Sequence, residues 1–155
     1  MRFTRFFPLI LMIICILLVS CSPSALQLQA RIADAIGRTA NSALPVLVES
    51  ETEQGNVAID SATSATEANE RLRVIVDRWR PFWGAWEILR EAQGQWATLI
   101  EQSRAGRPIG ALEAVRIVGS IQRAWCALSA SLPPPNQLPA IPGVTCTNDA
   151  GVINE

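Results

Sequence analysis

The chain has 155 residues, of which 13 are Arg, 14 are Asp or Glu and none is Lys, His or Tyr, so its net charge is −1. A weakly acidic chain has no basic field to attract nucleic acid. Without His it lacks the commonest metal ligand and the usual partner of a nucleophilic Ser or Cys. The composition therefore argues against nucleic-acid binding, against a metal or another cofactor, and against an enzyme.

The first 20 residues have the three parts of an export signal. Arg2 and Arg5 supply positive charge, Phe6–Val19 is almost wholly apolar, and the small residue Ser20 precedes Cys21. The apolar run is shorter than the roughly 20 residues that a membrane span needs. We therefore expect a signal peptide over residues 1–20 that is cleaved before Cys21, with an uncleaved single-pass helix as the alternative.

The four residues Leu18-Val19-Ser20-Cys21 resemble the lipobox of bacterial lipoproteins. The resemblance covers only the signal region and indicates no finer family. It implies that the Cys21 sulfur carries a diacylglycerol, and more than one acyl chain makes such an anchor stable. Ser22 stands where an Asp would favour retention in the inner membrane. The resemblance thus implies the cell envelope, in the outer membrane facing the periplasm if the source is Gram-negative.

Removal of the signal leaves a chain of single-domain size. It also removes Arg2 and Arg5, so that 11 Arg face 14 acidic residues and the net charge becomes about −3 if the amino terminus is acylated. The composition and the spacing of apolar residues predict a helical domain over residues 21–132. The frequent Pro residues beyond it predict an extended tail over residues 133–155.

The first predicted helix runs from about Ala25 to Val48. Pro45 is expected to kink it or to end it near Leu44, because Pro removes a helical hydrogen bond and crowds the preceding turn. The polar stretch Glu49–Ala65 that follows is expected to be a mobile connection with at most a helical turn or two.

The second predicted helix, from about Thr66 to Ser103, has the clearest pattern in the chain. Its apolar residues recur in alternating steps of three and four, with one polar interruption at Gln93, as along one seam of a packed helix. Pro81 lies within this run. Because the phase continues through Pro81, we favour one kinked helix; in the alternative, Pro81 begins a separate helix. The seam consists of Leu72, Ile75, Trp79, Phe82, Trp86, Leu89, Gln93, Trp96 and Ile100.

A third helix is expected from about Ile109 to Ala130, after a tight turn at Ala105–Pro108. Its apolar positions again follow steps of three and four. The second and third helices can pack antiparallel along their length, and the first must then cover what they leave exposed. The predicted fold is therefore all-α: a helical hairpin plus an N-terminal helix, similar to a three-helix bundle.

Cys126 and Cys146 are the pair of cysteines left after the signal peptide and the lipidated residue are set aside. Two thiols without His make a poor metal site, and an oxidising compartment favours a disulfide between them. The alternative is two free thiols. A bridge would fold the tail back onto the third helix, with a turn near Asn136.

One aromatic cluster suggests a site. Trp79, Trp83 and Trp86 share a helix face and are flanked by Arg78 and Arg80. The interpretation we favour is core packing, because large aromatic side chains bury much area. The functional alternatives place them at a lipid headgroup boundary or around a slot for an apolar ligand, and Trp83 is the best candidate because it lies off the seam.

Two function classes follow from these features. We expect a lipid-anchored envelope protein with a non-enzymatic structural or interaction role, whose partners are the membrane through Cys21 and either another envelope protein or a second copy of itself. The alternative is a carrier or sensor of an apolar ligand that uses a Trp-lined slot. A more distant possibility is a phage or mobile-element lipoprotein that alters the host surface.

Overall fold

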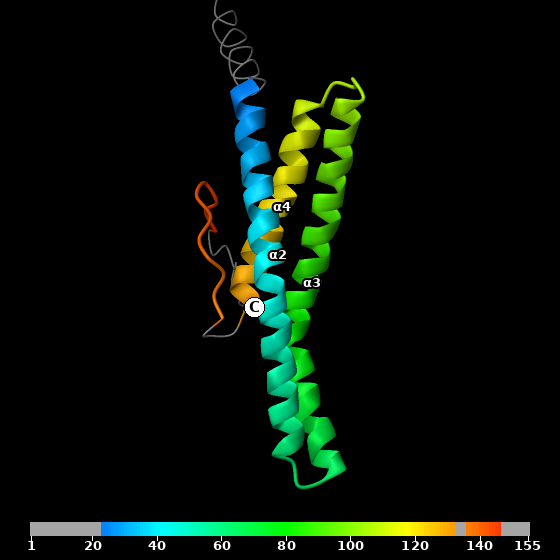
Figure 1. The fold of residues 1–155 in the computed structure, drawn as a ribbon, viewed down its shortest axis with the longest axis vertical. Helices are drawn as coiled ribbons and strands as arrows, with labels where there is room; N and C mark the ends of the chain where they lie inside the picture. Colours follow the sequence, from blue (N-terminus) through cyan, green and yellow to red (C-terminus); the bar gives the residue numbers. More distant parts are fainter. Residues whose placement is uncertain (1–22, 133–135, 147–155) are drawn as a thin grey trace, which may run out of the picture.

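The computed structural model describes residues 23–132 and 136–146. Within these ranges the chain forms three helices and no strand: α2 (Pro23–Asp60), α3 (Ala65–Arg104) and α4 (Ala111–Ser131). The three helices pack as a bundle, which confirms the predicted all-α fold (Figure 1). The predicted signal peptide and Cys21 lie outside the described residues. In the described part, no helix has the length and apolar character needed to cross a membrane.

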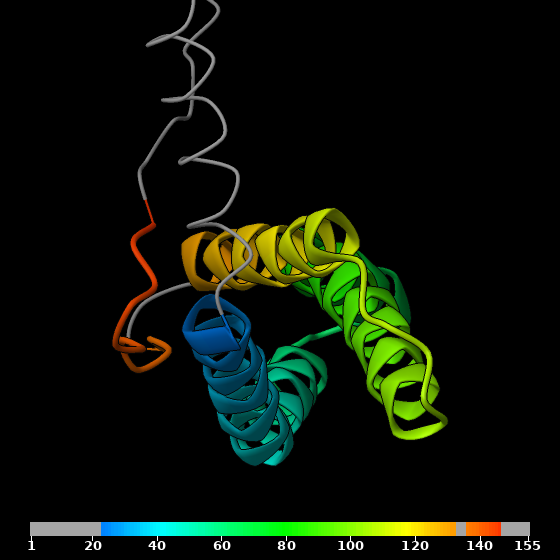
Figure 2. The ribbon, with the colours of Figure 1, turned by 90° about the horizontal axis from the view of Figure 1, so that it is seen from above.

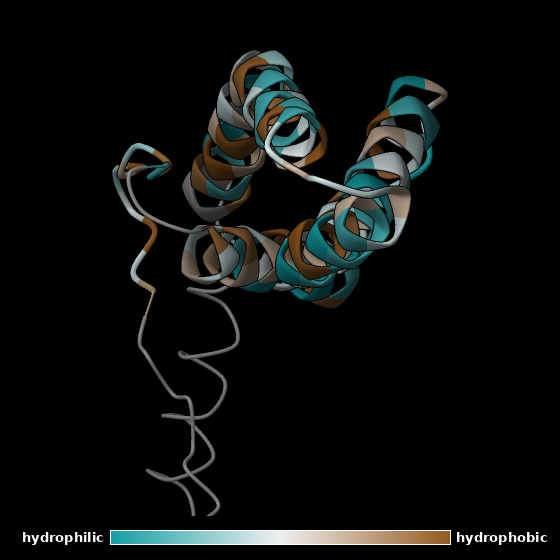
Figure 3. Cartoon of the chain, turned by 90° about the horizontal axis from the view of Figure 1, so that it is seen from below, coloured by the Kyte–Doolittle hydropathy of each residue, from teal (hydrophilic) through white to brown (hydrophobic). Residues whose placement is uncertain are grey.

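The core lies where all three helices meet. α3 and α4 form an antiparallel pair with the most extensive interface, and α2 packs against both (Figures 1 and 2). Hydrophobic and hydrophilic residues alternate around each helix, so that each has an apolar side to bury (Figure 3). The largest side chains that are fully buried come from all three helices: Ile36, Trp79, Phe82, Leu89, Val118, Ile121 and Leu128.

α2 continues through Pro45 and ends at Asp60. The prediction that the first helix ends near Leu44 or Val48 was therefore wrong. Proline inside a helix costs about 3 kcal/mol. Here its ring is exposed, while Ala40 before it and Leu47 after it are both buried in the core. Burial on both sides of the proline keeps the two halves in one helix, because the apolar contacts outweigh the lost hydrogen bond.

The expected mobile connection over 49–65 is also corrected. α2 extends to Asp60, and the turn to α3 is only the four residues 61–64. The helix persists because its polar residues make specific contacts with α3: Gln54 accepts a hydrogen bond from Trp79, and Glu51 accepts one from Trp83. These contacts join residues 25 and 32 positions apart, beyond the reach of a local sequence pattern.

α3 is one helix with Pro81 inside it, as the uninterrupted phase predicted. Beyond Leu89 the buried residues are Ala92 and Leu99, whereas Gln93 and Ile100 of the predicted seam are only half-buried. α2 diverges from this end of α3, and α4 remains its neighbour (Figures 1 and 2). The last turns of α3 therefore bury the side that faces α4 rather than the side that faces α2.

The C-terminal segment 136–146 has no helix or strand and lies on the side of α2 and α4 away from α3 (Figure 2). Ile141 is buried against the core, and Leu138 and Val144 pack beside it. The chain turns at Gly143, whose φ of 84° suits glycine. The turn expected near Asn136 adjoins residues 133–135, which lie outside the described ranges. The last nine residues of the tail also lie outside them.

α4 ends halfway along the bundle. Just beyond it, the side chain of Asn136 donates a hydrogen bond to Ser50 of α2 (Nδ2 to Oγ, 3.2 Å), which marks the level that the third layer reaches. Past this level α2 and α3 continue without α4 (Figure 1). We call this projection the arm: α2 from Ser50 to Asp60, the turn 61–64, and α3 from Ala65 to Arg78.

Candidate functional site

The predicted aromatic cluster divides between the core and its margin. Trp79 has no exposed surface and Trp86 is also buried, whereas Trp83 is half-buried. All three surround Phe82, with ring centroids 5.5, 4.9 and 6.3 Å from it. Edge-on and stacked contacts at these distances are favourable between aromatic rings. Trp79 and Trp86 thus serve core packing, the interpretation favoured from the sequence.

Trp83 makes a polar contact between the helices rather than lining an open slot. Its indole Nε1 donates a hydrogen bond to Glu51 Oε2 at 2.9 Å, from α3 to α2. One helical turn earlier, Trp79 Nε1 donates to Gln54 Oε1 at 3.4 Å. These two bonds fix how α2 and α3 are aligned along their axes, because each joins a ring on one helix to a polar side chain on the other.

The two arginines beside the cluster differ in their partners. Arg80 pairs with Asp77 on its own helix (Nη2 to Oδ1, 2.6 Å). Arg78 is exposed and has no ion-pair partner within the described residues. Arg78 is therefore the one of the two that is free to meet an acidic group from outside the chain.

A groove runs between the two helices of the arm. Its volume is about 630 Å³, within the range of roughly 300–1,000 Å³ that small-molecule pockets span. Its floor is apolar, with Ala58 buried and Ile75 half-buried, and Val57 and Val74 beside them are 61% and 54% exposed. We call it the arm groove; it is lined by Ser50, Glu53, Gln54, Val57, Ala58, Arg71, Val74, Ile75 and Arg78.

The rims of the arm groove carry opposite charges. α2 contributes Glu53, and α3 contributes Arg78 together with Arg71, which is paired with Glu67. From Thr39 to Asp60 the ionisable residues of α2 are all acidic, which makes that whole side of the arm negative. The groove therefore combines an apolar floor with one acidic and one basic edge, the composition of a protein-docking surface.

The tip of the arm is held by a compact polar network. Ser64 begins α3 and its side chain accepts a hydrogen bond from the Glu67 backbone N at 3.2 Å. The Glu67 carboxylate accepts bonds from Thr63, through both its hydroxyl and its backbone N–H, and from Arg71. The bonds from the Thr63 hydroxyl and backbone, followed by that from Arg71, lower the pKa of Glu67 to about 2.

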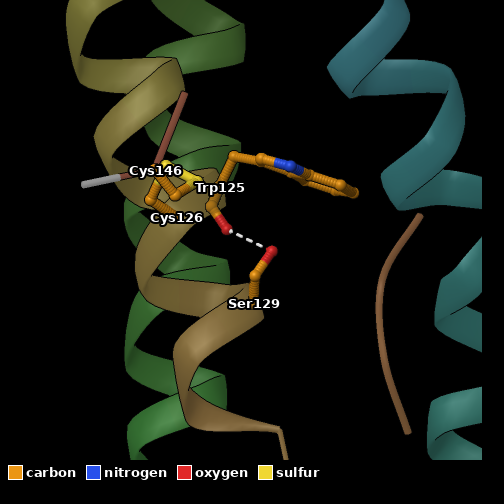
Figure 4. Close-up of a disulfide and its surroundings, with 4 residues drawn as sticks. All are labelled: Trp125, Cys126, Ser129 and Cys146. Carbon is orange, nitrogen blue, oxygen red and sulfur yellow. Dashed lines mark hydrogen bonds between the residues drawn. A yellow bond between two sulfur atoms is a disulfide. The ribbon is translucent and has the colours of Figure 1, made fainter. Parts of the chain in front are cut away.

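The structure joins Cys126 and Cys146 as a disulfide with their Cα atoms 5.3 Å apart, which fits the predicted bridge (Figure 4). It ties the C-terminal segment to α4. The neighbouring Trp125 points its ring away from the sulfur atoms, and its carbonyl accepts a bond from Ser129 at 3.0 Å (Figure 4). The bridge thus has a structural position, and neither of its cysteines lines the arm groove.

Carboxylates do not gather into a metal site in the described part of the chain, where no group of three or more potential ligands meets. Glu87 and Glu91 are both exposed on α3, and Gln95 donates a hydrogen bond to Glu91. This surface position is ordinary for charged residues on a helix.

Sequence reasoning identified Arg78 and Trp83 but missed the α2 half of the groove. Glu53 and Val57 fall in the stretch that was expected to be a loop, so no helical face was assigned to them. The available signal was the spacing of Gln54, Val57 and Ala58, which places all three on one side of a helix once the helix is extended.

Comparison with known protein families, with curated proteins and with solved structures finds nothing that matches this chain.

Proposed function

We propose that this chain is a lipid-anchored protein of the cell envelope with a non-enzymatic role, and that it presents the arm groove to a protein partner. The observation that carries this proposal is the arm itself. α2 and α3 extend past the end of α4 with an apolar groove between them, and no third helix of the described residues covers it (Figure 1). Exposed apolar surface framed by charge is typical of interaction sites.

The lipobox resemblance at Cys21 gives the arm its direction. α2 begins at Pro23, two residues after the proposed anchor, and its 38 residues span about 57 Å at 1.5 Å per residue. A lipid on Cys21 would hold the first turn of α2 at the membrane and place the tip of the arm far from it. We propose the periplasmic face of the outer membrane as the location if the source is Gram-negative.

The proposal of a non-enzymatic role rests on the residues available. The chain contains no His, the commonest general base. The polar side chains of the aromatic cluster and of the arm tip are engaged in bonds that join helices or cap them, as with Glu51 and Glu67. Their contacts account for their positions without a reaction.

An apolar-ligand carrier is the second candidate, and the arm groove is the feature that favours it. Its volume would accept a small apolar molecule. The site would differ from the one expected from the sequence, because neither Trp83 nor another Trp lines this groove.

Two experiments in the native host test the proposal. Cys21→Ser should move the protein from the membrane fraction to the soluble fraction. A photo-crosslinking residue in place of Val74 should yield an adduct with a protein, whereas the same residue in place of Ile88 should not. Ile88 is the matched control, because it is also exposed on α3 but does not line the arm groove.

Unchanged fractionation of Cys21→Ser would contradict the anchor. Equal adducts at positions 74 and 88, or none at either, would contradict the interaction site. If the protein is a carrier, a fluorescent fatty acyl probe should bind the purified protein, and Val74→Arg should abolish this binding. Such binding, with no protein adduct at position 74, would favour the second candidate.

A further inference from the structure

We infer that the occupant of the arm groove is the arm of a second copy of this chain, and that the two copies lie parallel, with α2 of each against α3 of the other. This inference rests on the proposed function, because it names the partner for the same groove. Three observations carry it: the missing third layer, the opposite charges of the two rims, and the level at which the charged residues lie.

The arm lacks the layer that the rest of the bundle has. In the core each helix packs against two others, whereas past Ser50, toward the turn 61–64, the described residues place α2 and α3 against each other without α4. Val57 and Val74, which line the groove between the helices, are more than half exposed. Two such arms placed face to face would form a four-helix arrangement that buries both apolar floors.

The charges select how the arms would face each other. A two-fold axis along the helices places α2 of one copy opposite α3 of the other, so the acidic rim of each meets the basic rim of its partner. An axis across the helices places α2 opposite α2 instead. That arrangement would bring the acidic rim that carries Glu53 in one copy against the same rim of the other, and like charges at an interface are strongly unfavourable.

The level of two residues then fixes the contact. Gln54 is bonded to Trp79, and Glu53 and Arg78 each precede one of these residues on antiparallel helices. At 1.5 Å of rise per residue they therefore lie within about 3 Å of the same level, on opposite rims. The axis along the helices keeps levels unchanged. Glu53 of each copy therefore meets Arg78 of the other, and the symmetry forms this pair twice.

Both charges are available for these pairs. Glu53 and Arg78 are exposed, and neither is in an ion pair within the described ranges 23–132 and 136–146. The parallel arrangement is also the one that two chains anchored at their amino ends in one membrane can form. Anchoring raises their effective concentration, so a modest groove suffices for association.

The test uses the full lipidated chain in detergent micelles, with dimerisation measured by sedimentation equilibrium. We expect the unmodified protein to dimerise. Glu53→Arg and Arg78→Glu should each raise the dimer dissociation constant by about tenfold or more, because each creates two like-charge contacts. The double variant carrying both changes should restore the dissociation constant to within about threefold, since the charges are then exchanged across the interface.

Glu87→Arg is the matched control, because Glu87 is exposed on α3 away from the groove; it should leave dimerisation unchanged. Circular dichroism verifies that each variant is folded. A monomer at every concentration, or single variants that dimerise as well as the unmodified protein, would overturn the inference. If the protein is monomeric but the adduct at position 74 forms with a different protein, the inference fails and the proposed function stands.

Discussion

The indole of Trp83 and the carboxylate of Glu51 join α3 to α2 at 2.9 Å, near the level where α4 ends. Trp83→Phe removes the N–H donor together with the second ring of the indole, while a six-membered ring remains beside Phe82. A hydrogen bond to a charged group contributes about 1.5–3 kcal/mol, and partial exposure places this one near the lower value. We therefore expect the free energy of unfolding in urea to fall by at least about 1.5 kcal/mol, since the lost ring contacts add to the lost bond. The control Glu49→Gln, on the exposed side of α2, should change it little; an equal effect of both variants would contradict the assigned bond.

Two glycines inside helices should respond differently to Ala. Nothing lies within 4 Å of a Cβ added at Gly94, so Gly94→Ala should stabilise by about 0.8–1 kcal/mol through helix propensity alone. A Cβ added at Gly37 would lie 3.2 Å from Gln93 Nε2, an atom that is buried without a hydrogen-bond partner. Gly37→Ala should therefore raise the stability less than Gly94→Ala does. In a background that carries Gln93→Ala, Gly37→Ala should raise the stability as much as Gly94→Ala. Thermal unfolding of the four variants tests this coupling, and equal gains at both glycines would exclude it.

Loss of the disulfide should loosen the C-terminal segment. The bridge joins residues 20 positions apart, and closing a loop of this size contributes about 3 kcal/mol in the chain-entropy model. We expect Cys126→Ser with Cys146→Ser to lower stability by about this amount and to raise hydrogen exchange around Ile141, which packs on the core. Intact mass after alkylation, with and without reductant, tests the bridge itself. Two alkylated thiols before reduction would show that it is absent.

The arm tip should be sensitive to acid through Glu67. Its pKa is about 2 in the folded chain, below the ordinary value of 4.5, so folding favours its charged form. The stability it contributes is present above about pH 4.5 and is lost as the pH falls toward 2. Between pH 5.5 and 2.5, the melting temperature of the unmodified protein should fall further than that of Glu67→Gln.

The control for this comparison is Glu70→Gln on the same helix, because Glu70 is exposed and forms neither an ion pair nor a side-chain hydrogen bond among the described residues. It should follow the unmodified protein across the pH range. Parallel curves for the unmodified protein and Glu67→Gln would contradict the role of the Glu67 network.

The sequence predicted the parts of the fold that depend on local periodicity. The three helices, the passage of α3 through Pro81 and the turn after Arg104 all follow from apolar spacing and from Gly and Pro positions. Pro45 and the polar stretch after it were misjudged because their helical state depends on distant contacts. Trp79 and Trp83, on another helix, provide the partners that hold this stretch.

Only one side of the candidate site could be predicted from the sequence, because the other side also depends on contacts between distant segments. Arg78 was recognised beside the aromatic cluster, but the acidic rim that faces it is on α2. Which two helices pair past Ser50, and that α4 stops there, depends on the lengths of all three helices together. An apolar groove formed in this way has no signature in a single segment of sequence.

The pairing of two arms is tested most directly by thiol crosslinking between differently tagged chains. Val57→Cys is placed in one chain and Val74→Cys in the other, because these residues border the arm groove on α2 and α3 and are exposed. In shared vesicles under mild oxidation, the parallel arrangement predicts strong crosslinking between unlike chains and weak crosslinking between like chains. Crosslinks between two Val57→Cys chains that equal or exceed those between unlike chains, or no crosslinks at all, would contradict it.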